Sequence, residues 1–403
     1  MSKDPKVLHV VKWYPHASDP QNGIFVQKHI EATSDTPMVL GFVNSNDKLE
    51  EYEGIQIYGA QDMSQVAKFA VFADRIATDR PAIVHFHSYA PDLLPLLWYT
   101  RLKGIKTIHT EHGSAFLKDR LSSLQGWRFK AARWYFQRLD RLICISPILS
   151  EGLSAFSKNQ RVHVIPNIIS TAKNEHTSTP SRFSFCVVAD VIFETKTQEI
   201  ILACFQQLPQ AQAELHFYGG GPDLERLKAL VRTLPNVWVH GRKTNKEILQ
   251  LLPNHNALIL HSNYETFGIA VFEARTAGLW AISKSTFGGA PWYDKGVLLA
   301  DTHEALKDQM KSLLQAEKAP LGKFDALSSE SIGLEIHQLY REILGWPFYF
   351  HDYPLYLLDK KHLKMKRLLL VIAGLSLIGA AAQEARVDLG RNVEMYVANH
   401  ADG

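Results

Sequence analysis

Residues 257–278 read ALILHSNYETFGIAVFEARTAG. The stretch opens on four apolar residues that predict a buried strand, and from Ile269 onward its apolar residues recur at helical spacing. A turn containing Gly268 separates the two segments, and glycine there allows the backbone to come close to a ligand. A strand followed by a turn and a helix is the repeating unit of α/β folds. The stretch therefore predicts one such unit.

The same order repeats along the chain on both sides of this stretch. The strands expected in the first half are Lys6–Val11, Val39–Val43, Ile83–His87, Lys106–His109, Leu142–Ile145 and Val162–Ile165. Those expected in the second half are Phe183–Val188, Glu214–Tyr218, Val237–His240, Ala257–Leu260, Trp280–Ser283 and Val297–Ala300. Segments with helical periodicity separate them, among them Ile24–Ala32, Leu93–Leu102, Trp127–Leu139, Lys196–Leu208, Asp223–Leu234, Lys246–Leu252, Ile269–Ala277 and Glu304–Leu314. This alternation predicts parallel sheets covered by helices on both faces.

The two series predict two tandem, Rossmann-like, doubly wound domains. They cover residues 1–167 and 183–346, and residues 168–182, rich in Ser, Thr and Asn, are typical of a linker. A length of 403 residues fits two domains. In such sheets ligands bind beyond the carboxyl ends of the strands, so an interdomain cleft would form one shared site.

The composition excludes several classes of protein. Apolar residues make up 46% and charged residues 21%, the balance of a globular chain. A net charge of +3 is too small for a nucleic-acid binder, which needs a concentrated basic surface. The three cysteines lie in apolar runs without metal-ligand spacing. They predict buried free thiols in a reducing, cytoplasmic compartment.

The two ends of the sequence differ in character. The N-terminal apolar run is too short for a signal peptide and leads into a patterned strand. Residues 347–403 form an atypical extension in which basic residues 360–367 precede the apolar segment 368–382. Its 15 residues fall short of the ~20 that span a membrane. A short or interfacial membrane anchor, a docked terminal helix and a segment joined from a neighbouring gene all stay open.

The turn in residues 262–278 has the chemistry of an anion site. Backbone N–H groups at Phe267, Gly268 and Ile269 would point into the cleft from the positive end of a helix, which suits a diphosphate. Glu265 could accept hydrogen bonds from sugar hydroxyls, and Glu273 could bind the two hydroxyls of a ribose. Two glutamates at this spacing also occur by chance, and a solvated helix face is their commonest setting. Their position beside a glycine turn favours the site.

The pattern SxxETFGIxxxEAxxxG resembles the signature of family 4 glycosyltransferases, retaining enzymes of the GT-B fold with an E-x7-E pair. The resemblance covers about residues 5–346. Further segments are similar to family motifs: the first loop with Gly23, the TxH segment 108–113, the serine-ending strand 143–146, the IPN step 164–167 and the GxGP turn 217–222.

The resemblance implies a site and an activity. It implies transfer of a hexosyl group from a nucleotide sugar to a glycan or lipid-linked acceptor, in bacterial surface-polysaccharide synthesis. Because no DxD-like metal motif stands out in the sequence, no metal cofactor is expected. It places Glu265 and His112 in catalysis, and the donor on Gly23, Lys196, Gly219, Arg242, Thr266, Phe267, Gly268, Ile269 and Glu273. The alternatives are that the glycines at 23 and 219 serve only as turn residues and that the histidine at 112 has only a structural role. His87 and His109 are further candidates for acceptor contacts.

The chain departs from the family pattern where the diphosphate would find its cationic partners. Family members carry a glycine and an arginine after the first strand of the second domain, whereas residues 188–196 here contain Asp190 and Glu194 and keep only Lys196. Loss of a bidentate arginine would weaken the site, and Arg242 could compensate. His261 replaces a usual proline, Leu279-Trp280 replaces a Gly-x-Pro-Val entry, and residues 286–291 resemble a loop near the donor.

Residues 116–141 carry seven Lys or Arg against two Asp, interleaved with aromatic residues. Such a helix suits an anionic membrane surface or a lipid-linked glycan, and would allow peripheral contact at the inner face of the cytoplasmic membrane. An amphipathic helix packed on the sheet explains the same pattern. Two rivals to a transferase also stay open: a GT-B epimerase or phosphorylase, and a non-catalytic GT-B relative that binds partners.

Overall fold

The computed structural model describes residues 5–34, 36–43, 49–52, 55–59, 63–157, 161–171, 182–346, 385–388 and 394–397. Residues 1–347 form one compact unit and residues 348–403 a second. In the second unit the structure describes an antiparallel pair, β15 (Ala385–Asp388) with β16 (Glu394–Val397). The predicted apolar segment 368–382 lies outside the described residues, so its three interpretations remain predictions.

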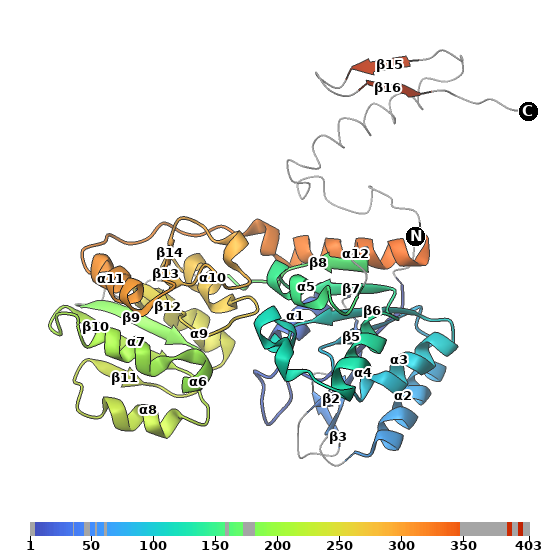
Figure 1. The fold of residues 1–403 in the computed structure, drawn as a ribbon, viewed down its shortest axis with the longest axis horizontal. Helices are drawn as coiled ribbons and strands as arrows, with labels where there is room; N and C mark the ends of the chain where they lie inside the picture. Colours follow the sequence, from blue (N-terminus) through green and yellow to red (C-terminus); the bar gives the residue numbers. More distant parts are fainter. Residues whose placement is uncertain are drawn as a thin grey trace, which may run out of the picture. The chain divides into compact units, whose positions relative to one another are not determined.

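The first sheet of residues 1–347 has the order β3-β4-β2-β1-β5-β6-β7-β8 (Figure 1). All its neighbouring strands pair in parallel except β3 with β4 at one edge. The strands are β1 (Val7–Val11), β2 (Met38–Val43), β3 (Leu49–Tyr52), β4 (Ile55–Gly59), β5 (Ile83–His87), β6 (Lys106–Glu111), β7 (Arg141–Cys144) and β8 (Val162–Val164).

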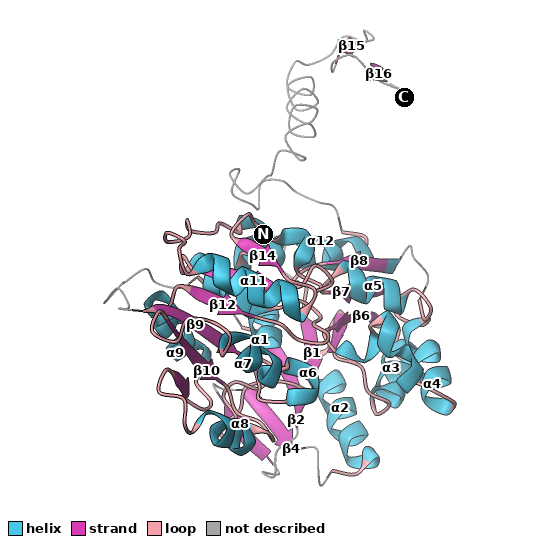
Figure 2. Cartoon of the chain, turned by 60° about the vertical axis from the view of Figure 1, so that its left-hand side comes forward, coloured by secondary structure: helices cyan, strands magenta, loops and turns pink. Residues whose placement is uncertain are grey.

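Helices cover both faces of this sheet. One face packs on α2 (Gln65–Asp79), α3 (Leu93–Leu102), α4 (Trp127–Phe136) and α5 (Pro147–Leu153), whose apolar residues join Val84 and Phe86 in one core (Figure 1 and Figure 2). The other face packs on α1 (Ile24–Glu31) and α12 (Ser329–Leu344). Short 3₁₀ helices span Ser114–Phe116 and Lys118–Ser123.

The second sheet has the order β11-β10-β9-β12-β13-β14 and is parallel throughout. Its strands are β9 (Phe183–Val188), β10 (Ala213–Tyr218), β11 (Val237–Val239), β12 (Ala257–Ile259), β13 (Trp280–Ser283) and β14 (Val297–Leu299). The helices are α6 (Phe193–Lys196), α7 (Gln198–Phe205), α8 (Leu224–Val231), α9 (Asn245–Leu251), α10 (Ile269–Thr276) and α11 (His303–Leu313), with 3₁₀ turns at Leu252–Asn254, Ala290–Trp292 and Asp325–Leu327. α7, α8 and α11 pack on one face, and α9 and α10 on the other.

The predicted fold class is confirmed, with two local corrections. The helix expected over Lys196–Leu208 is α7, Gln198–Phe205, and Lys196 instead ends the preceding α6. The two helices are separate because Thr197 adopts a left-handed conformation (φ 50°) and its hydroxyl donates to the His261 carbonyl. α12 lies in the sequence of the predicted second domain, yet it returns to the first sheet, where Ile332, Ile336 and Tyr340 pack against Ile83 and other strand residues.

The three cysteines are free and buried, as predicted. The predicted linker begins with two buried residues, because Ile168 and Ile169 pack into the first domain's cores and the Ile169 N–H donates to the Leu327 carbonyl. Within the described residues, no helix combines the length and the apolar character that crossing a bilayer requires.

Candidate functional site

A cavity of about 230 Å³ is lined by residues of both Rossmann-like domains. Several of its walls follow directly on the carboxyl ends of strands, where doubly wound folds bind ligands. The lining consists of Phe25, His112, Ile145 and Asn167 from the first sheet's side and of Val188, Ala189, Asp190, Lys196, Leu260, Glu265, Thr266, Phe267, Gly268, Ile269 and Ala270 from the second. Of the predicted site residues, Gly23, Gly219, Arg242 and Glu273 are outside this lining.

The turn before α10 forms one wall of the cavity. Gly268 is the N-cap of α10, with φ 86°. The first N–H groups of a helix have no intrahelical acceptors, and no side chain caps them here. The loop after β13 braces the turn: a Cβ at Gly288 would lie 1.8 Å from the Thr266 carbonyl oxygen, and the Gly288 N–H donates to the Glu265 carbonyl at 3.2 Å. Glycine is therefore required at 288 for packing and at 268 for conformation.

Glu265 and Lys196 form an ion pair at the cavity wall. The Lys196 ammonium donates to Glu265 Oε2 at 2.6 Å, and both side chains are mostly but not fully buried. The pair places one negative and one positive group beside the N-terminus of α10. A sugar hydroxyl and a phosphate oxygen could each replace part of this contact.

Glu273, in the second turn of α10, lies behind the lining. It is buried and accepts a hydrogen bond from the Asn245 amide at 3.0 Å, and the Lys28 ammonium lies 3.6 Å away. Burial raises the pKa of Glu273, and the Lys28 charge opposes that rise. Lys28 belongs to α1, so Glu273 joins the two domains in this structure.

The missing arginine of the family pattern is not replaced directly. Asp190 lines the cavity, and Arg242 reaches its carboxylate at 3.4 Å while also pairing with Asp19 at 3.3 Å. Arg242 is about half exposed and lies outside the lining, so it offsets the charge of Asp190 without itself facing the cavity. Lys196 is the cation in the described lining.

His112 lines the cavity from the first domain. Its ring packs against Phe25 at 5.0 Å and His29 at 5.4 Å between centroids, and Asn167 lies beside it. Burial, and then the neighbouring His29 and His109, hold the pKa of His112 well below its ordinary value, so the imidazole is neutral at neutral pH. A neutral imidazole can donate one hydrogen bond to a sugar hydroxyl.

Glu111 positions the loop that carries His112. Its carboxylate accepts from the backbone N–H groups of Tyr89 at 2.9 Å, His112 at 3.0 Å and Gly113 at 2.7 Å. It also contacts His109 Nε2 at 3.1 Å. Because these bonds fix the chain on both sides of His112, Glu111 is a positioning residue.

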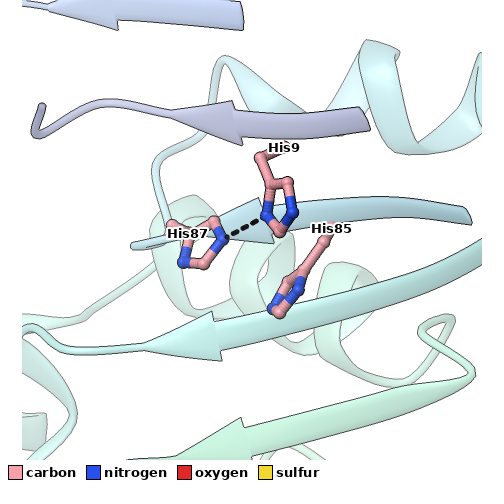
Figure 3. Close-up of side chains that lie close together, drawn as sticks. All are labelled: His9, His85 and His87. Carbon is pink, nitrogen blue, oxygen red and sulfur yellow. Dashed lines mark hydrogen bonds between the residues drawn. The ribbon is translucent and has the colours of Figure 1, made fainter. Parts of the chain in front are cut away.

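Three buried histidines of β1 and β5, His9, His85 and His87, lie close together (Figure 3), and the ring of His87 stacks on that of His112 at 5.9 Å between centroids. His9 Nδ1 and His87 Nε2 are 3.1 Å apart, and His85 bonds to the Tyr340 hydroxyl and to Thr110, each at 2.7 Å. Their ligand atoms lie within 4.8 Å of one another, a spacing that could hold a metal ion. Hydrogen bonds occupy both nitrogens of His85, whereas the buried Nδ1 of His87 has no hydrogen-bond partner among the described residues.

Two glycines predicted to contact the donor serve close packing. A Cβ at Gly23, which has φ 65°, would lie 2.3 Å from the Trp13 carbonyl carbon. A Cβ at Gly219 would lie 1.8 Å from the carbonyl oxygen of Ala189, which lines the cavity. Gly23 is also the N-cap of α1, which presents Phe25 to the cavity, so both glycines shape its walls from behind.

The acceptor contacts predicted for His87 and His109 need correction. Both side chains are buried at strand positions and neither lines the cavity. His109 points to the opposite face of the sheet, where it bonds to Tyr135 and Glu111, and His87 lies behind His112 with 5.9 Å between ring centroids. The alternation of side chains along a strand explains why neighbouring histidines face different surroundings.

Two family models match the chain in succession. The one described as Glycosyltransferase Family 4 covers residues 53–173, and the one described as Glycosyl transferases group 1 covers residues 171–322. The chain belongs to the family 4 glycosyltransferases. The second match includes both Glu265 and Glu273 with the turn between them.

Curated relatives of this glycosyltransferase are distant. N-acetyl-alpha-D-glucosaminyl L-malate synthase of Bacillus anthracis is 22% identical over 320 residues, which cover 71% of this chain and 81% of the relative. A subunit of the human phosphatidylinositol N-acetylglucosaminyltransferase is 24% identical over 225 residues, or 53% of this chain. The match spans only 45% of the human protein's length.

A solved structure shares the fold of this glycosyltransferase. The lipopolysaccharide outer core galactosyltransferase WaaB, without ligand, has a TM-score of 0.59 and 17% identity, with 84% of this chain and 99% of that one covered. The GT-B arrangement of two facing Rossmann-like domains is thus that of a known transferase.

Sequence reasoning did not assign several residues that shape the site. Glu111 stands inside the quoted TxH segment, and an acid at the end of an apolar strand was the available signal. Asn167 and Phe25 also lay in quoted motifs without an assigned role. Lys28 and Asn245 carried no signal, because the contacts that join them to each other and to Glu273 bring together three separate segments of the chain.

Proposed function

We propose that this glycosyltransferase moves a hexosyl group, with retention of its anomeric configuration, from a nucleotide sugar to a glycan or lipid-linked acceptor in bacterial surface-polysaccharide synthesis. The observation that carries the proposal is the uncapped N-terminus of α10 at Gly268, with Glu265 beside it and Glu273 behind it, in a cavity between two Rossmann-like domains. Retention rests on the resemblance to the family. The relatives' names, which include N-acetylglucosaminyl and galactosyl transfer and a phosphatidylinositol acceptor, support this class of reaction.

In this proposal each residue of the site has a separate role. The N–H groups at the start of α10 and the Lys196 ammonium stabilise the charge that develops on the leaving diphosphate. Glu265 accepts hydrogen bonds from hydroxyls of the transferred sugar, and neutral His112 donates to it from the other domain. Glu273 takes the ribose hydroxyls, which requires Lys28 or Asn245 to share the carboxylate. The enclosing domains exclude water and so favour transfer over hydrolysis.

The second candidate is a non-catalytic relative, because the acidic Asp190 lines the cavity where the family has an arginine. A panel of nucleotides separates the two candidates. A nucleoside diphosphate at a hundredfold excess over its Kd should raise the melting temperature of a unit this size by about 4 °C. Thermal shift with UDP, GDP and ADP species measures this, and mass spectrometry of released nucleotide then identifies the donor sugar. If none of these ligands stabilises the protein, the enzyme proposal is wrong.

Removal of divalent metals is expected to leave the transfer rate unchanged within about twofold, because α10 and Lys196 supply the positive charge that a metal would. The measurement compares initial rates in EDTA with rates in added Mg²⁺ or Mn²⁺. A loss of activity in EDTA that metal restores would contradict the metal-free site.

The proposal also includes a place in the cell. Three buried free thiols support a reducing compartment, and a lipid-linked acceptor would bring the protein to the inner face of the cytoplasmic membrane.

A further inference from the structure

The outer surface of α3 and α4 exposes large apolar side chains. Trp98 and Leu102 on α3 are 54% and 66% exposed, and Trp127 at the start of α4 is 63% exposed. The two helices lie side by side, and Arg101 of α3 donates to the Arg138 carbonyl just after α4 at 2.6 Å (Figure 1 and Figure 2). We call the exposed residues of α3 and α4, with Lys103, the α3–α4 surface.

The α3–α4 surface is also basic. Its exposed cations are Arg101, Lys103, Arg128, Lys130 and Arg133. Among the described residues none of these five forms an ion pair, whereas Arg226 and Lys228 on α8 pair with glutamates. Two of them lie over aromatic rings instead: Lys103 over Tyr99 at 5.4 Å and Arg128 over Trp127 at 5.9 Å. The surface therefore combines cations that form no ion pair among the described residues with exposed tryptophans, which suits an anionic and partly apolar partner.

Of the two interpretations of residues 116–141, the packed amphipathic helix describes one side of α4, and the membrane surface stays a prediction for the other. Ala132, Tyr135 and Phe136 face the core, as an amphipathic helix on a sheet requires. The opposite side carries the cations and Trp127. Tryptophan is enriched where a bilayer meets water, because its ring is apolar and its N–H is polar. Lysine and arginine near an anionic leaflet each add about 1 kcal/mol of attraction.

We infer that the α3–α4 surface binds an anionic bilayer directly. The exposed Leu102 beside the Trp side chains favours lipid, and the net charge of +3 is small for a nucleic-acid binder. This inference extends the lipid-linked acceptor of the proposed function, since an acceptor held in a membrane has to be reached from its surface. The binding itself needs neither donor nor acceptor.

Sedimentation with vesicles tests the inference on the full chain. The protein should pellet with vesicles of phosphatidylcholine and phosphatidylglycerol in equal parts, and should stay in solution with phosphatidylcholine alone. The triple variant Arg128→Ser, Lys130→Ser, Arg133→Ser should bind more weakly by roughly fivefold for each charge removed. The double variant Trp98→Ala, Trp127→Ala should bind more weakly, and the binding that remains should stay sensitive to salt, because its charges are intact.

The matched control is the triple variant Arg226→Ser, Lys228→Ser, Arg232→Ser on α8 and its C-cap. It also removes three exposed cations and leaves the exposed Leu230 beside them. It should bind the anionic vesicles like the unchanged protein, and melting temperatures confirm that all variants fold. The inference is overturned if the unchanged protein ignores anionic vesicles, if both triple variants lose binding equally, or if a DNA fragment binds in place of vesicles. The sedimentation experiment contains no sugar donor, so its result does not depend on whether the protein transfers sugar.

Discussion

Replacement of Glu265 by glutamine is expected to lower the rate of sugar transfer by about two to three orders of magnitude. The amide keeps the shape of the side chain but removes the negative charge that faces the transferred sugar and the Lys196 ammonium at 2.6 Å. The fold should persist, because a partly exposed ion pair contributes only about 0–1 kcal/mol to stability. Affinity for a nucleoside diphosphate should hold or improve, since Lys196 is then free to meet the phosphates.

Initial rates with the donor found in the nucleotide panel measure this effect, and thermal shift with the diphosphate alone measures binding. Glu225→Gln is the matched control: the same change, in the same domain, at an exposed residue paired only with Lys228. A Glu265→Gln protein that transfers sugar within about twofold of the unchanged protein would remove Glu265 from the reaction. Equal loss in both variants would point to damage outside the cavity.

Local patterns were enough to predict the parallel strands of the two sheets except β4, and the edge pair β3–β4, with its antiparallel β3, was not predicted. Each strand between β5 and β14 is a short apolar run between segments of helical periodicity, and a parallel sheet buried on both faces produces that pattern. The same argument fails for α12. Its apolar face resembles that of any helix in the second domain, and only the packing of Ile332, Ile336 and Tyr340 shows that it covers the first sheet.

The residues of the site also fall into those that the sequence could predict and those that it could not. Residues 265–269 could be predicted because the turn, the glycine and the helix are contiguous in sequence. The position of Arg242 could not, since it depends on Asp19 and Asp190 from two other segments. His109 was assigned to the cleft because it stands near a strand end, but the side chain's face is set by the pleat and by Tyr135, which sequence spacing alone did not reveal.

Acidification is expected to unfold the protein cooperatively between about pH 6 and pH 4. Burial lowers the pKa of His9 to about 3 and that of His29 to about 4, and holds the pKa values of His85, His87 and His112 well below the ordinary value. In the unfolded chain these groups protonate near pH 6.5. The unfolded state therefore binds more protons below that pH, so the stability is fully present above about pH 6.5 and is lost as the pH falls.

The magnitude follows from the linkage between protonation and folding. At pH 5, His9 and His29 alone remove about 2 kcal/mol each, which is a large share of a total stability of about 5–15 kcal/mol. Urea unfolding at a series of pH values measures the slope. His9→Asn should make the slope smaller by about 1.4 kcal/mol per pH unit in this range, even if it lowers stability at neutral pH.

The control for this slope is His303→Asn, which removes an exposed imidazole on α11, outside the histidine cluster. It should change the pH dependence of unfolding much less than His9→Asn does, because its exposed ring acts on the buried histidines only through His261, at 5.7 Å between ring centroids. A stability that stays constant from about pH 7 to pH 4.5 would mean that the buried imidazoles find new partners when protonated. Because His112 stacks on His87 of this cluster and lines the cavity, loss of nucleotide binding should accompany unfolding in a single transition. Binding that is lost well above the unfolding pH would separate the cavity from the cluster.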